Sequence, residues 1–185
     1  QELLILWKRF RDVSIDYFKK IYKILDIDFD LWDSESFYQK FVGEVIKEAL
    51  DKTVAHKEPD GPVVVSLDQF KLPSFLLAKS DGASLYGARD LAAAKWRLEN
   101  YHPAKIIHVV GHEQELYFKQ IFKTLELMGY PAEKFTHISY GLVTMGGKKL
   151  STRTGHVVYL EDLLEETIKK AKDIKEVGVG AVVYS

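Results

Sequence analysis

Residues that could do chemistry gather in three segments, and the first covers residues 79–90. Small residues, glycine and charges alternate there, as in a connection from a strand to a helix. Asp90 lies at the predicted helix start, where the helix dipole favours an ionised carboxylate. Beside the ring of Tyr86, that carboxylate would suit a cationic ligand such as a guanidinium or an ammonium. A helix cap next to a turn at Asp81 and Gly82 would explain the same residues without any ligand.

The second segment, residues 110–114, lies between a predicted strand and a predicted helix. Gly111 would let the backbone turn tightly, so that Glu113 and Gln114 project from the carboxyl edge of a parallel sheet, where ligands bind. Their side chains would accept hydrogen bonds from sugar hydroxyls or offer an amide to a polar substrate. An ordinary strand-to-helix turn has the same composition, so both explanations stay open.

The third segment, residues 145–155, is a glycine-flanked loop that carries Lys148, Lys149, Arg153 and several hydroxyl groups, including that of Ser151. Cations neutralise phosphate, while hydroxyls and backbone amides donate hydrogen bonds to it. Flexible glycines would let the loop close when the charge is bound. The spacing is not that of a P-loop. The alternative is an exposed, solvated hairpin, because lysine-rich loops often bind nothing.

Several other chemistries find no support in the sequence. The six histidines do not follow metal-ligand spacing and the chain has no cysteine, so we predict no metal site. No G-x-S-x-G motif indicates a serine nucleophile.

The 26 Lys and Arg residues nearly balance the 27 Asp and Glu residues, which argues against binding nucleic acid by bulk charge. The apolar runs are too short to cross a membrane and the lack of cysteine fits a reducing compartment, so we expect a cytoplasmic protein.

The elements that must position these segments change in character along the chain. Apolar residues recur at helical spacing over residues 15–25, behind a possible Ser14 cap, and again over residues 37–50. A turn-rich stretch at residues 56–62 then marks a boundary. We therefore predict a helical segment over residues 1–60 and a second part over residues 61–185.

In the second part, predicted strands alternate with predicted helices. The strands are expected at residues 63–67, 75–78, 105–110, 137–144 and 155–159, and the helices at residues 91–98, 116–128 and 160–171. This order predicts an α/β fold with a mainly parallel sheet, flanking helices and a helical N-terminal segment.

Taken in order, these segments resemble the catalytic domain of arginyl-tRNA synthetases, which belong to class I of the aminoacyl-tRNA synthetases. The matching stretches are residues 79–82, 86, 89–92, 109–114, 128–130, 140–143, 149–155, 157–158 and 160. The resemblance runs from about Leu6 to the C-terminus, and residues 7–11 and 35–38 are similar to the segment inserted between the two halves of that domain. It implies a partial Rossmann-like sheet, with residues 61–185 as the C-terminal half of the catalytic domain and residues 1–60 as the inserted segment.

The resemblance also implies an activity and its substrates. An arginine–tRNA ligase uses ATP, with Mg²⁺, to convert arginine to arginyl-adenylate and pyrophosphate, and then transfers the arginine to tRNA(Arg); no tightly bound cofactor is implied. Carried over by motif, the implied arginine pocket consists of Tyr86, Asp90 and Gln114. The implied ATP site consists of Gly111, Glu113, Leu142, Val143 and Lys149, and the implied catalytic residues are Lys149, Ser151 and Arg153. A carboxylate fixed near a helix start suits a guanidinium, in agreement with the first assignment.

Within the ATP site the implied roles differ. Gly111 and Glu113 resemble the position that holds the ribose, and Leu142 and Val143 resemble the backbone strip that reads the adenine edge. Residues 149–153 resemble the signature loop Lys-Met-Ser-Lys-Ser, whose cations stabilise the charge that moves onto pyrophosphate.

Three departures from the family pattern bear on activity. Thr152 replaces the second lysine of the signature loop, as in many arginyl enzymes, and Tyr117 stands where the family often has histidine. The His-Ile-Gly-His type motif of class I is not in the sequence, which begins with Gln1. We therefore expect a fragment that is inactive or nearly so, because a transition state needs all its charges placed at once.

The expected partners are arginine, ATP and tRNA(Arg), with no membrane. We expect the parent protein to be a monomer and the isolated chain to be able to self-associate through exposed sheet edge and apolar surface. The alternative function is that of a synthetase-like paralogue that binds arginine or RNA without catalysis.

Overall fold

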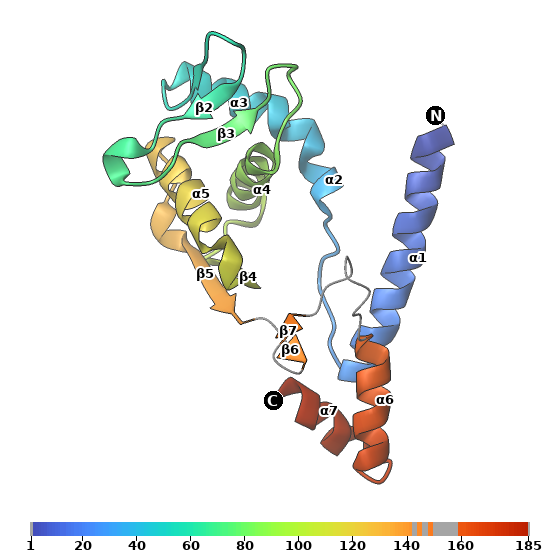
Figure 1. Ribbon diagram of the computed structural model, residues 1–185. Helices are drawn as coiled ribbons and strands as arrows, with labels where there is room; N and C mark the ends of the chain where they lie inside the picture. Colours follow the sequence, from blue (N-terminus) through green and yellow to red (C-terminus); the bar gives the residue numbers. More distant parts are fainter. Residues whose placement is uncertain (1, 142–143, 146–147, 150–158, 185) are drawn as a thin grey trace. The chain divides into compact units, whose positions relative to one another are not determined.

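The computed structural model of the chain describes residues 2–141, 144–145, 148–149 and 159–184 (Figure 1). The chain divides into two compact units. Gln1–Trp32 and Val143–Ser185 form the first unit, and Asp33–Leu142 form the second unit. The predicted boundary near residue 60, between a helical inserted segment and the C-terminal half of a catalytic domain, stays a prediction.

The first unit contains the helices α1 (Glu2–Leu25), α6 (Leu160–Lys170) and α7 (Lys175–Val183), and the strands β6 (Thr144–Met145) and β7 (Lys148–Lys149), which pair antiparallel. The prediction of a cap at Ser14 is wrong, because α1 begins at Glu2 and Ser14 lies inside it. The Ser14 hydroxyl donates to the carbonyl of Phe10 at 2.9 Å, one turn earlier, as serines inside helices do. Within the described part of the chain, no helix is long and apolar enough to span a bilayer.

The second unit begins with the helices α2 (Glu35–Tyr38) and α3 (Val42–Asp51), joined by a 3-10 turn at Gln39–Phe41. The strands β1 (His56–Lys57), β2 (Val63–Val65) and β3 (Phe75–Ala78) follow as an antiparallel sheet in that order. The strands predicted at residues 63–67 and 75–78 therefore exist but do not join a parallel sheet. The link between them is too short for a parallel crossover, which takes about a dozen residues or more.

The rest of the second unit follows the predicted strand-and-helix order. Helix α4 (Tyr86–Tyr101) leads to β4 (Ile106–Gly111), α5 (Glu115–Leu127) and β5 (Phe135–Tyr140). Strands β4 and β5 pair in parallel from Ile106 opposite Phe135 to Gly111 opposite Tyr140, with α5 as the crossover helix beside them (Figure 1). The α/β class with a parallel strand pair and flanking helices is thereby confirmed. The side chains of Ile107, Val109 and Ile138 alternate along these strands and are exposed.

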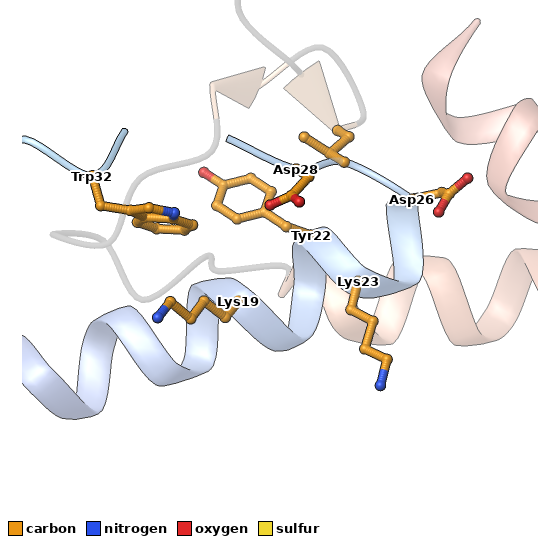
Figure 2. Close-up of a pocket in the computed structure, with 7 residues that line it drawn as sticks. Lys19, Tyr22, Lys23, Asp26, Asp28 and Trp32 are labelled. Carbon is orange, nitrogen blue, oxygen red and sulfur yellow. The ribbon is translucent and has the colours of Figure 1, made fainter. Parts of the chain in front are cut away.

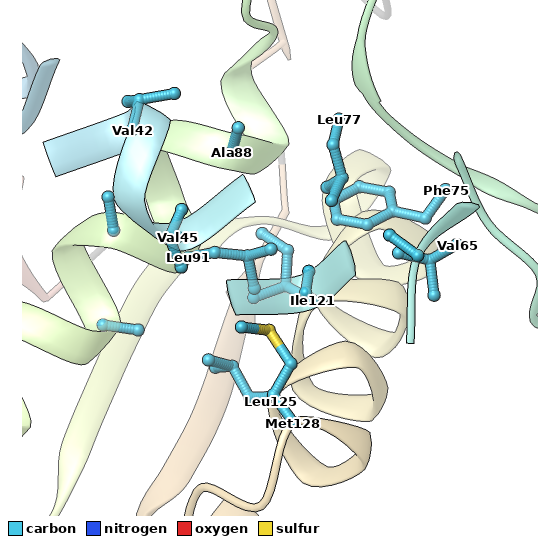
Figure 3. Close-up of a cluster of buried hydrophobic side chains, with 14 of the residues drawn as sticks. Val42, Val45, Val65, Phe75, Leu77, Ala88, Leu91, Ile121, Leu125 and Met128 are labelled. Atoms are coloured by element: carbon cyan, nitrogen blue, oxygen red, sulfur yellow. The ribbon is translucent and has the colours of Figure 1, made fainter. Parts of the chain in front are cut away.

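The core of the second unit lies where α3, β2, β3, α4 and α5 meet (Figure 3). It contains Val45, Val65, Leu77, Leu91 and Leu125, all at most 1% exposed. Full burial of side chains of this size stabilises a fold by about 1.5–3 kcal/mol each. This packing fixes α4 and α5 against each other; α4 carries Tyr86 and Asp90 of the predicted arginine pocket, and Gln114 directly precedes α5.

A polar cluster beside the core ties α3 to α4 and to the end of α5. The carboxylate of Glu48 accepts hydrogen bonds from Lys52 at 2.7 Å, Lys95 at 3.0 Å and the Tyr130 hydroxyl at 2.9 Å. Burial by itself raises the pKa of Glu48, but the hydrogen bonds from these three groups outweigh it and lower the pKa to about 2. The pKa of Lys95 is correspondingly raised, because its hydrogen bonds to Glu44 and Glu48 outweigh the opposing effect of burial.

Candidate functional site

A cavity of about 560 Å³ in the second unit brings together side chains from α2, α4, the β4–α5 turn and α5. It is lined by Glu35, Tyr86, Asp90, Glu113, Gln114 and Tyr117. Four of these residues are predicted site residues from two separate segments of the sequence. The predicted arginine pocket and the predicted ribose-binding glutamate thus lie around one space.

Asp90 is placed by α4 and by a hydrogen bond from α5. Helix α4 begins at Tyr86, so Asp90 lies one turn inside it, later than the helix start expected from the sequence. The Tyr117 hydroxyl donates to Oδ2 of Asp90 at 2.6 Å. Burial raises the pKa of Asp90, and the hydrogen bond from Tyr117 opposes that rise. Burial and the hydrogen bond from Tyr117 are therefore the two largest influences on the pKa of this carboxyl.

Tyr117 is itself held in one protonation state and one orientation. Burial raises the pKa of its hydroxyl, and the hydrogen bond to Asp90 raises it further, so Tyr117 remains a donor. Its ring meets the ring of Phe75 edge-on, with 5.8 Å between centroids. The sequence offered only one signal for this residue, its place in the family pattern where histidine is common.

Tyr86 and Glu35 lie on different helices but share a partner, Arg89. The guanidinium carbon of Arg89 lies 5.0 Å from the centroid of the Tyr86 ring. Its Nη1 donates to Oε2 of Glu35 at 3.3 Å. Glu35 was not among the predicted site residues, because a glutamate in the first turn of a helix is common for reasons of the helix dipole alone.

Gly111 ends β4 and starts the 3-10 turn His112–Gln114 that leads into α5. The expected turn is present, but the φ of Gly111 is −54°, which any residue can adopt, so the turn does not require glycine. Instead, a Cβ on Gly111 would come within 2.8 Å of Oε2 of Glu113. The Glu113 carboxylate thus lies close to Gly111, and Glu113 and Gln114 both line the cavity, as expected for the carboxyl end of a parallel strand.

Most of the predicted nucleotide-binding and signature-loop residues are not among the residues that the structure describes. Leu142, Val143, Ser151 and Arg153 lie outside the described residues. Lys149 is described only through its backbone in β7, in the first unit. Among the residues that the structure describes, no group of three or more His, Asp or Glu residues could hold a metal ion.

The first unit has a cavity of its own, of about 440 Å³ (Figure 2). It is lined by Lys19, Tyr22, Lys23, Asp26, Ile27, Asp28 and Trp32. Tyr22 and Trp32 are ring neighbours with 5.9 Å between centroids, and Lys19 Nζ lies 5.3 Å from the centroid of the Trp32 ring. The two lysines offset the two aspartates in charge and none of the predicted site residues lines this cavity, so the cavity around Asp90 is the candidate site.

Known proteins match the chain over almost its whole length. Residues 1–183 match the family described as the catalytic domain of class I tRNA synthetases (R). The arginine–tRNA ligase of Clostridium perfringens is 44% identical over 201 residues, covering 100% of this chain and 35% of that protein. The arginine–tRNA ligase of Clostridioides difficile is 43% identical over 200 residues, with the same coverage. The chain thus spans 35% of the length of these curated relatives.

Solved structures give the same picture of the fold. The arginyl-tRNA synthetase of Plasmodium falciparum matches 94% of this chain with 28% of its own, at a TM-score of 0.77 and 25% identity. The Thermus thermophilus arginyl-tRNA synthetase matches 85% of this chain with 35% of its own, at a TM-score of 0.67 and 21% identity, which bears on the fold alone. Because the family match covers almost every residue, the chain belongs to the arginyl-tRNA synthetases of class I, within their catalytic domain.

Proposed function

We propose that this chain is part of an arginine–tRNA ligase. In that reaction, ATP and arginine form arginyl-adenylate and pyrophosphate, and the arginine then passes to the terminal adenosine of tRNA(Arg). The observation that carries the proposal is the cavity in which carboxylates from α2 and α4 face the same space as the ring of Tyr86 and the amide of Gln114. This set of groups matches the charge, planarity and donors of a guanidinium.

The arrangement favours arginine over lysine through geometry. A guanidinium presents a planar fork of donors that a carboxylate can accept in pairs, whereas an ammonium is a compact point charge. Tyr117 orients the Asp90 carboxylate by its 2.6 Å hydrogen bond, so the acceptor is fixed before the ligand arrives. Glu35 supplies a second carboxylate, and the face of the Tyr86 ring attracts the delocalised cation.

ATP and its Mg²⁺ enter the proposal as substrate and counter-ion. Glu113 would accept hydrogen bonds from the ribose hydroxyls, and it lines the same cavity as Tyr86, Asp90 and Gln114, the side chains proposed to bind arginine. Leu142 and Val143 would read adenine. Lys149, Ser151 and Arg153 would bind the phosphates and stabilise the charge that moves onto pyrophosphate.

We also propose that the 185-residue chain alone has little or no ligase activity. The His-Ile-Gly-His type motif is not in its sequence, and catalysis requires all the reacting groups to be placed together. The longer protein that contains this chain would act in the cytoplasm, and it would be a monomer. The exposed apolar side chains of β4 and β5 are where the isolated chain would self-associate.

Calorimetric titration of the chain with arginine and with lysine tests the amino-acid pocket. We expect arginine-selective binding that Asp90→Asn weakens by about 10-fold to 100-fold, the loss expected for a hydrogen-bonded charge pair. Asp51→Asn, at an exposed site on α3, is the matched control and should bind as the wild type does. A folded chain that binds both amino acids equally, or neither, would contradict the pocket.

Ligation by the longer protein that contains this chain separates an enzyme from a paralogue. ATP–pyrophosphate exchange that depends on arginine, followed by transfer to tRNA, is the expected result. Arginine binding without exchange or transfer would favour the non-catalytic paralogue instead.

A further inference from the structure

Arg89 has contacts that link two walls of the cavity. It directly precedes Asp90 on α4, and its side chain is 28% exposed. Its guanidinium lies over the ring of Tyr86 and donates to Glu35, which is 54 positions away in the chain. Its Nε is buried and has no hydrogen-bond acceptor among the described residues.

Fold stability alone accounts poorly for this arrangement. Glu35 is 59% exposed, and ion pairs to such exposed groups contribute little. Tyr86 is 61% exposed, so stacking on its ring covers little apolar surface. The buried Nε without an acceptor costs free energy. The effect of these contacts is instead to fix the Tyr86 ring and the Glu35 carboxylate, which both line the cavity.

A second arginine on the same helix shows the structural alternative. The guanidinium carbon of Arg97 lies 5.2 Å from the centroid of the Tyr38 ring, nearly the same distance as between Arg89 and Tyr86. Tyr38, however, is 2% exposed and belongs to the interior. Arg97 therefore packs on a ring that is already held, whereas Arg89 holds a ring that solvent would otherwise leave free to move.

We infer that Arg89 is a positioning residue of the arginine cavity, which fixes the Tyr86 ring and the Glu35 carboxylate in the places where a guanidinium ligand meets them. This inference rests on the proposed function for the identity of the ligand. Arg89 uses one face of the Tyr86 ring and Oε2 of Glu35. The second face of the ring and the second carboxylate oxygen are the groups that a bound guanidinium would use.

The charge of Arg89 also acts on Asp90, but that effect is shared. Glu35 raises the pKa of Asp90 through space, while Arg97 and Arg89 both lower it, against the larger effect of burial. Loss of either arginine should therefore move the acid limb of arginine binding to higher pH. Only loss of Arg89 should release Tyr86 and Glu35.

The test compares Arg89→Gln, Arg89→Lys and Arg97→Gln in the whole 185-residue chain by NMR and calorimetry. Without ligand, we expect Arg89→Gln to shift the ring resonances of Tyr86 and the side-chain resonances of Glu35, and Arg97→Gln to leave both in place. With ligand, Arg89→Gln should weaken arginine binding about 10-fold, within the range for residues in contact. Arg89→Lys retains the charge but not the planar fork, so it should recover part of the affinity.

The outcomes separate this inference from the proposed function. Unchanged Tyr86 and Glu35 resonances in folded Arg89→Gln would overturn the inference. An equal loss of arginine affinity in Arg97→Gln would also overturn it, because Arg89 would then act only through its charge. A wild-type chain that binds no arginine, with Tyr86 and Glu35 still released by Arg89→Gln, would overturn the proposed function and leave the positioning role in place. Should Arg89→Gln fail to fold, the Tyr86 and Glu35 resonances of Arg89→Lys decide.

Discussion

Replacing Glu48 by glutamine should destabilise the second unit strongly. The pKa of this carboxyl is lowered from 4.5 to about 2 by hydrogen bonds from Lys52, Lys95 and Tyr130, which outweigh the effect of burial. A pKa difference of one unit corresponds to about 1.36 kcal/mol, so this lowering of the pKa corresponds to about 3.4 kcal/mol in favour of the folded state. The side chain is 20% exposed, so solvent screening reduces the figure, and we expect Glu48→Gln to cost about 2 kcal/mol at neutral pH.

The lowered pKa of Glu48 also determines how its contribution to stability changes with pH. Because the folded-state pKa of Glu48 is below the unfolded value, its contribution is complete above about pH 4.5 and is lost as the pH falls towards 2. Urea unfolding at pH 7 and at pH 3 measures the difference between wild type and variant. We expect this difference to shrink at the lower pH.

Asp51→Asn is the matched control for Glu48→Gln. Asp51 lies on the same helix and pairs with Lys47 at 3.5 Å, but it is 63% exposed. Such a pair contributes about 0.5 kcal/mol or less. The reasoning is refuted if Glu48→Gln costs no more than Asp51→Asn at pH 7, or if its cost is the same at both pH values.

Three further predictions concern the site and its support. Tyr117→Phe removes the hydrogen bond that opposes the raised pKa of Asp90, so the acid limb of arginine binding should move to higher pH in calorimetric titrations; an unchanged limb would contradict this role. Burial lowers the pKa of His108 from 6.5 to about 4, so the wild type should lose stability as the pH falls from 6.5 to 4, and His108→Phe should show a flatter profile of urea midpoints over that range. Gly87→Ala would place a Cβ against the Phe75 ring, so it should lower stability by about 1–3 kcal/mol, and a thermal midpoint equal to that of the wild type would speak against the packing.

The elements that the sequence predicts well are those with local causes. The parallel pair β4 and β5 and the crossover helix α5 follow from short runs of apolar residues at strand and helix spacing, and these patterns are satisfied within about a dozen residues. The antiparallel pairing of β2 with β3 depends instead on the length of their link, which excludes a crossover. The Ser14 cap failed for a related reason, since serine is also compatible with a helix interior.

Part of the candidate site could also be predicted from local sequence patterns, and part of it could not. Tyr86, Asp90, Glu113 and Gln114 lie in two short segments whose residue types indicate binding, and the structure brings them to one cavity. Glu35 joins them only because α2 packs on α4, a contact that no local pattern contains. The raised pKa of Asp90 could not be predicted either, because it depends on burial and on a hydroxyl from another helix.

The way the cavity is assembled has a consequence for the order of folding. Asp90 and Tyr117 are 27 positions apart, whereas Arg89 and Glu35 are 54 apart, with the whole antiparallel sheet between them. Contacts between distant positions require a larger loss of chain entropy and form later unless strong packing rewards them early. The Glu35–Arg89 contact is exposed, so it adds little stability of its own and depends on the packing of α2 on α4. We therefore expect the Asp90–Tyr117 contact, which needs only α4 and α5, to be able to form without α2, whereas the wall that contains Glu35 is complete only once α2 packs on α4.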